Sequence, residues 1–154
     1  MKRWMWLLCG LLAFWMIEET GSQVEQLQPV QLLQVTKKNG SIFLRTDTKD
    51  FGMGETLQSA LADLQETSEK QIFLETADML VLGENTENLL PELKMYLRPA
   101  VQVCSIRDEI DLSQAAVYLK NHGSQVRLGR WEEDRKLPEL KASEGRLRLE
   151  GSNG

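Results

Sequence analysis

The stretch Met79-Leu80-Val81-Leu82-Gly83 decides the fold of this 154-residue chain. Four consecutive apolar residues closed by a glycine predict a short β-strand that is buried on both faces. A strand with one face in water would instead alternate apolar and polar residues. A strand of this kind belongs inside a sheet that other elements cover. Helices and further strands are therefore expected on either side of it.

Three segments around this strand have the periodicity of amphipathic helices, with leucine or alanine recurring at i, i+3, i+4 and i+7. They span residues 56–67, 86–97 and 112–121. The second contains Pro91 in its first turns and ends before Arg98-Pro99. The third begins at Asp111 or Ser113, either of which can cap a helix. The helices are expected to cover the sheet.

Further strands are predicted on both sides of the central one. Asn39-Gly40 favours a tight hairpin turn between two strands rich in β-branched and apolar residues. The predicted strands cover residues 30–36, 41–48, 71–75, 79–82 and 101–106, and residues 146–149 form a further edge strand whose charges protect it. Phe51-Gly52-Met53-Gly54 breaks the pattern before the first helix. The sequence thus predicts a single α+β domain, a mixed sheet covered by about three helices, preceded by an N-terminal hydrophobic helix.

Composition excludes several classes of protein. Lysine and arginine number 18 against 23 aspartate and glutamate, so the net charge is -5, and hydrophobic residues make up 42% of the chain. These proportions of apolar and charged residues are those of an ordinary globular protein, and they exclude a disordered or collagen-like chain. The net negative charge argues against nucleic-acid binding, which normally needs a basic patch. One histidine and two cysteines leave little material for a metal site, and no cofactor is expected.

The first residues have the pattern of a membrane-targeting segment. Lys2 and Arg3 precede an uncharged run over residues 4–17, and two glutamates follow it. A helix of 14 residues is about 21 Å long, shorter than the roughly 30 Å hydrocarbon core and typical of a signal-peptide core. The charges place the rest of the chain outside the cytoplasm. The membrane-anchoring residues are expected to be Trp4, Trp6, Leu7, Leu8, Leu11, Leu12, Phe14 and Trp15.

Three fates remain open for this segment. It is retained as a short anchor, or cleaved so that the domain is secreted, or lipidated at Cys9. We expect residues 1–20 to be a signal anchor or signal peptide, 21–29 a spacer, 30–150 the domain and 151–154 a frayed tail.

The sequence offers weak signals of chemistry, each with a simpler structural interpretation. Gly52-Met53-Gly54 before a helix is similar to a phosphate-binding turn but lacks the other residues of such motifs. His122 at a helix end is explained by the helix dipole. Two acidic clusters, residues 108–111 and 132–134, are interpreted as a loop with a helix cap and as a solvated face. No catalytic residue is predicted.

Cys104 and Trp131 are the remaining unusual residues. Cys104 lies in an apolar strand and is expected to be a buried, inert thiol without a disulfide partner. Trp131 lies inside a charged run. Two interpretations stay open for it: a core residue, or part of a surface that contacts a partner.

The segment 54–99 resembles a known family. Gly54-Glu55-Thr56-Leu57 begins a helix with Ala60-Leu61 and Leu64. Two strands follow and end in Gly83-Glu84, and a leucine-rich helix ends in Tyr96-Leu97-Arg98-Pro99. With the closing segment 136–145, this arrangement resembles the N-terminal domain of the spore germination receptor C-subunit family, the Ger(x)C lipoproteins.

The resemblance implies a function as well as a fold. It implies an accessory subunit, attached to the membrane on its extracytoplasmic face and without catalysis of its own. The partners it implies are the membrane and integral membrane germinant-receptor subunits, with no nucleic acid and no metal. The alternative is an extracytoplasmic domain that binds a small ligand and is secreted after signal cleavage.

Overall fold

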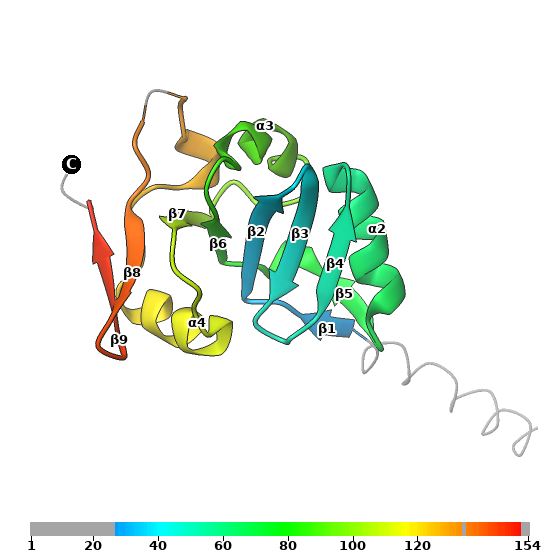
Figure 1. The fold of residues 1–154 in the computed structure, drawn as a ribbon, viewed down its shortest axis with the longest axis horizontal. Coiled ribbons are helices and arrows are strands. Elements are labelled where there is room, and N and C mark those ends of the chain that lie inside the picture. The colour runs from blue at the N-terminus through cyan, green and yellow to red at the C-terminus, as the bar shows by residue number, and fades with distance from the viewer. Residues whose placement is uncertain (1–26, 134, 152–154) are drawn as a thin grey trace, which may run out of the picture.

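The computed structural model describes residues 27–133 and 135–151. That part contains a seven-stranded mixed sheet and three α-helices, which confirms the predicted α+β class (Figure 1). The strands of the large sheet are β2 (Leu32–Lys38), β3 (Ser41–Thr46), β4 (Phe51–Gly54), β6 (Met79–Leu82), β7 (Gln102–Ile106), β8 (Glu139–Ser143) and β9 (Arg146–Glu150). The α-helices are α2 (Leu57–Thr67), α3 (Leu90–Leu93) and α4 (Leu112–Asn121). The predicted N-terminal hydrophobic helix and its anchoring residues lie outside the described residues.

Successive strands are added in opposite directions on the two sides of the boundary between β2 and β6. The spatial order is β4-β3-β2-β6-β7-β8-β9, in which β2, β6, β7 and β8 run parallel and a hairpin flanks them on each side. From β2 the chain continues to β3 and β4 on one side. From β6 it continues to β7 and β8 on the other. The boundary between β2 and β6 is therefore a topological switch point.

Several local predictions are confirmed. Asn39 and Gly40 have positive φ angles of 51° and 84° and join β2 to β3, as the hairpin signal indicated. β6 is buried along its whole length and lies between β2 and β7. Residues 146–150 form the edge strand β9 with exposed arginines.

The sheet has a separate apolar core on each face. On the first face, Leu33, Val35, Leu80 and Leu82 pack in one cluster with the buried residues of α2 and α3. On the second face, the alternate residues Leu32, Met79 and Val81 pack with the buried residues of α4. The alternation of strand side chains thus places α2 and α3 on one face and α4 on the other.

The prediction that residues 51–54 break the pattern is wrong, because they form β4 at the edge of the sheet. The glycines permit a close approach of α2. A Cβ at Gly52 would lie 2.5 Å from Leu64 Cβ. Helix side chains also bind the outer edge of the strand: the Met53 N–H donates to Asp63 Oδ2 at 2.7 Å, and the Thr67 hydroxyl donates to the Phe51 carbonyl at 2.8 Å.

Other boundaries also differ from the predictions. Residues 71–73 form β5 (Gln71–Phe73), which pairs with β1 (Leu27–Pro29) in a small parallel sheet instead of joining the large one, and η1 (Leu74–Thr76) follows as a 3-10 turn. The helix predicted over 86–97 is divided into η2 (Glu87–Leu89), α3 and mixed turns, whose hydrogen bonds alternate between three- and four-residue spacing. Its leucines are nevertheless buried.

Asp111 is the N-cap of α4, where its Oδ1 accepts hydrogen bonds from the Ser113 N–H at 2.8 Å and the Gln114 N–H at 3.3 Å. We expect Asp111→Ala to lower the free energy of unfolding by about 1 kcal/mol, because these N–H groups lose their acceptor. Asp111→Asn, which retains a capping oxygen, is expected to keep most of the stability of the parent protein. Urea denaturation measures both. An alanine variant as stable as the parent would contradict this assignment.

Candidate functional site

On the second face of the sheet α4 packs against Leu32 of β2 and Met79 and Val81 of β6, and no described helix covers the part of this face formed by β3 and β4 (Figure 1). The strand register places side chains on this open face in two rows. One row is Phe51, Arg45 and Gln34, and the next is Met53, Phe43 and Thr36. Phe51 and Met53 are 44% and 49% exposed. The open face therefore combines aromatic, cationic and amide groups.

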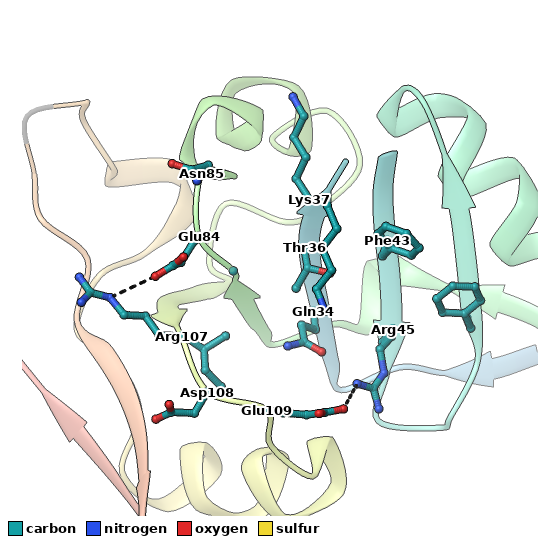
Figure 2. Close-up of a pocket in the computed structure, with 14 residues that line it drawn as sticks. Gln34, Thr36, Lys37, Phe43, Arg45, Glu84, Asn85, Arg107, Asp108 and Glu109 are labelled. Carbon is teal, nitrogen blue, oxygen red and sulfur yellow. Dashed lines mark ion pairs between the residues drawn. The ribbon is translucent and has the colours of Figure 1, made fainter. Parts of the chain in front are cut away.

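A cleft of about 430 Å³ lies where this open face meets the loops beyond β6 and β7. Figure 2 shows Phe43 and Arg45 on the β3 side of the cleft and Glu84, Arg107 and Asp108 on the other side. The cleft thus lies at the carboxyl ends of β2, β6 and β7, at the switch point of the sheet. In open parallel sheets this is the usual place for a ligand, and the volume is within the range of small-ligand pockets.

Gln34 is the most unusual residue of the cleft. Its side chain is on β2, only 6% of the residue is exposed, and it lines the cleft. Its Oε1 is buried and has no hydrogen-bond partner. A buried polar atom without a partner costs roughly 1–3 kcal/mol, so native proteins contain few of them. Because Gln34 lines the cleft, the donor that its Oε1 lacks would have to come from a group that enters beside this side chain.

The turn after β6 is held rigidly beside Gln34. The Thr86 hydroxyl donates to the Gly83 carbonyl at 2.7 Å, and Asn85 adopts a positive φ of 58° that asparagine tolerates better than most residues. Gly83 fits closely against β2, because a Cβ there would lie 2.8 Å from Thr36 Cγ2. These contacts fix Glu84 at the rim of the cleft.

The charged residues of the cleft are held in loose ion pairs. Arg107 Nε lies 3.5 Å from Glu139 Oε1 and 3.8 Å from Glu84 Oε1. Arg45 Nη1 lies 4.0 Å from Glu109 Oε1, and the Glu109 side chain is 93% exposed. Pairs of this kind contribute at most about 1 kcal/mol. Arg45 and Glu109 are therefore free to exchange their contact for one with a ligand.

The structure brings only some of the sequence-predicted residues to this cleft. Asp108 and Glu109, from the first acidic cluster, line it, whereas Asp111 caps α4. Glu132 and Glu133, from the second cluster, are exposed, and Asp134 is outside the described residues.

The other candidates have structural roles. His122 ends α4 and stacks on Tyr118 with ring centroids 4.7 Å apart. Gly52 and Gly54 form no phosphate turn, because they pack against α2. Trp131 lies in the first core, only 7% exposed, with the Lys94 ammonium 5.7 Å from its ring centroid. This placement favours the core interpretation over a partner surface.

Cys104 is buried in the second core, and burial raises the pKa of its thiol to about 12. We expect iodoacetamide at pH 8 to leave Cys104 unmodified in the folded chain and to alkylate it in urea, as peptide mass spectrometry can measure. Because the thiol of the unfolded chain ionises near pH 9, this group lowers stability as the pH rises from 9 toward 12. Rapid alkylation of the native protein would contradict the burial of the thiol.

Sequence reasoning missed Gln34, Thr36, Phe43 and Arg45 as site residues. The signal that would have found them is the alternation within the predicted hairpin. Gln34 lies between the buried Leu33 and Val35, and Thr36 follows Val35. One face of an otherwise apolar central strand therefore carries polar groups, which indicates a site rather than a core.

The described ranges, 27–133 and 135–151, contain no group of three or more histidine, cysteine, aspartate or glutamate side chains placed to hold a metal ion. None of their helices has the length and apolar character needed to span a membrane.

Comparison with known proteins gives no relative: no family model, no curated protein and no solved structure matches the chain.

Proposed function

We propose that this chain is a membrane-tethered, extracytoplasmic, non-catalytic interaction module and that the cleft beside Gln34 is its binding surface. The observation that carries the proposal is Gln34, a buried side chain that lines a cleft at the switch point of the sheet and whose Oε1 lacks a hydrogen-bond partner. The tether is proposed from the apolar run over residues 4–17.

A binding role fits the groups in the cleft better than a catalytic one. Nucleophilic catalysis needs a nucleophile beside a base. The described residues that line the cleft include Thr36, lysines and carboxylates, but none of these is hydrogen-bonded to another as a nucleophile is to its base. What they offer is two amides, two phenylalanines and charges of both signs. These groups hold a partner in place, and the proposal assigns them that role.

The resemblance to the first domain of spore germination receptor C subunits supports the same function and suggests the partner. On that basis the module works beside integral membrane germinant-receptor subunits. A second candidate is a secreted, extracytoplasmic domain that binds a small ligand. The volume of the cleft, which is that of a small-ligand pocket, favours this candidate.

Cell fractionation tests the proposal. Membranes from native cells are washed with high salt and then extracted with detergent, and the full chain is sized and run on a gel-filtration column. We expect the chain to resist salt, to need detergent, and to elute with a larger protein. A chain that appears outside the membrane about 20 residues short would overturn the tethered-module proposal. A rise in its melting temperature with an added small ligand would then favour the second candidate.

A further inference from the structure

We infer that the cleft binds an extended peptide segment of the partner, with an apolar side chain between two oppositely charged ones. This inference rests on the proposed function and specifies the chemistry of the partner. Three features of the cleft carry it: the buried amide, the aromatic wall and the separation of charges.

The Gln34 amide selects a group that can both donate and accept a hydrogen bond. Its buried Oε1 needs a donor, and its Nε2 is itself a donor. A peptide bond offers an N–H and a C=O on one rigid plane and so complements an amide. A lone ammonium or a lone carboxylate can satisfy only one of the two atoms.

The aromatic wall provides a place for an apolar side chain. Phe43 and Phe51 lie with ring centroids 6.0 Å apart and tilted by 37°; Phe43 is on β3, next to the strand of Gln34, and Phe51 is on β4 beyond it. Phe51 is 44% exposed, although an aromatic ring on a sheet gains by burial. An apolar side chain one residue from the peptide bond at Gln34 would cover this ring.

The charges of the cleft are divided between its two sides. Lys38 and Arg45 come from the β2–β3 hairpin, whereas Glu84, Asp108 and Glu109 come from the segments after β6 and β7. Figure 2 shows Glu84 and Asp108 across the cleft from Arg45, and Glu109 beside it. Arg107 lies on the acidic side, in loose ion pairs with Glu84 and Glu139. Glu109 lies beside Arg45, so a ligand across the cleft is matched when its carboxylate replaces Glu109 at Arg45 and its ammonium faces Asp108.

The probe for this inference is the capped tripeptide acetyl-Asp-Leu-Lys-amide, which has both charges, an apolar residue and internal peptide bonds. The full chain, labelled with ¹⁵N-glutamine and held in detergent micelles, reports on the Gln34 side-chain amide by NMR, and Gln34→Leu assigns that signal. We expect the Gln34 signal to shift saturably with added tripeptide. Arg45→Gln is expected to weaken the binding at least about tenfold, the size of one lost charge-assisted contact.

Two matched ligands make the test specific. Acetyl-Ala-Gly-Ala-amide has the peptide bonds without the charges or the leucine, and free leucine has both charges without a peptide bond. Both are expected to bind at least about tenfold more weakly than the probe. The inference is overturned if the probe leaves the Gln34 signal unchanged at about 10 mM, or if free leucine binds as well as the probe does.

This outcome is separable from that of the proposed function. Tripeptide binding by a chain that fractionates as a secreted domain would overturn the membrane-tethered module alone. If the chain co-elutes with a membrane partner but does not bind the tripeptide, only the peptide inference is overturned.

Discussion

Replacing Gln34 by leucine is expected to make the protein more stable, by about 1–3 kcal/mol, and to raise its melting temperature by several degrees. The substitution removes a buried acceptor that has no partner and puts a side chain of similar volume beside Val81, its neighbour on β6. Urea and thermal denaturation of the full chain measure the change. The reason for the gain is that the natural residue is suited to binding and not to stability.

Gln34→Glu is the matched control for this prediction. It preserves the shape of the side chain but buries a charge where the amide already lacks a partner, so we expect it to lower stability at pH 7. If Gln34→Leu lowered stability as well, the amide would have to be satisfied within the folded chain. The assignment of Gln34 to a binding site would then lose its main support.

Replacing Gly52 by alanine is expected to lower the free energy of unfolding by about 3 kcal/mol, the upper part of the range for overpacked sites. The new Cβ would lie 2.5 Å from Leu64 Cβ and 2.6 Å from the Leu64 backbone nitrogen. Neither atom belongs to the flexible end of a side chain, so α2 must move away from β4. That movement would disturb the Asp63 and Thr67 contacts that hold the edge strand.

Met53→Ala on the same strand is the control for the glycine variant. Met53 points to the open face and is 49% exposed, so its truncation is expected to cost under about 1 kcal/mol. Chemical denaturation compares the two variants. A Gly52→Ala protein as stable as Met53→Ala would show that α2 does not pack closely on β4.

The parts of the fold that were predicted are those with local signals. The Asn39-Gly40 turn, the fully apolar β6 and the capped helices α2 and α4 are each specified by their own residues, through φ preference, periodicity and capping. For these elements local and tertiary preferences agree, so the sequence alone was sufficient.

The parts that were missed depend on contacts between distant segments. Gly52 and Gly54 resemble a loop locally and become a strand because α2 packs on them. The helix expected over 86–97 buries its leucines with only a short α-helical turn. The site was missed for the same reason. Gln34 lies in register with Arg45 of β3 and Val81 of β6, and a linear pattern does not contain these neighbours.

The most direct test of the binding surface is photo-cross-linking in membranes of native cells. Benzoylphenylalanine is placed at Phe51 in the cleft or, as a control, at Met95, which is 73% exposed outside the cleft. We predict one discrete protein adduct from position 51 and none from position 95, and we predict that Arg45→Gln and excess acetyl-Asp-Leu-Lys-amide both suppress the adduct. An adduct that forms at position 95 alone, or that persists at position 51 despite both treatments, would contradict the cleft as the binding surface.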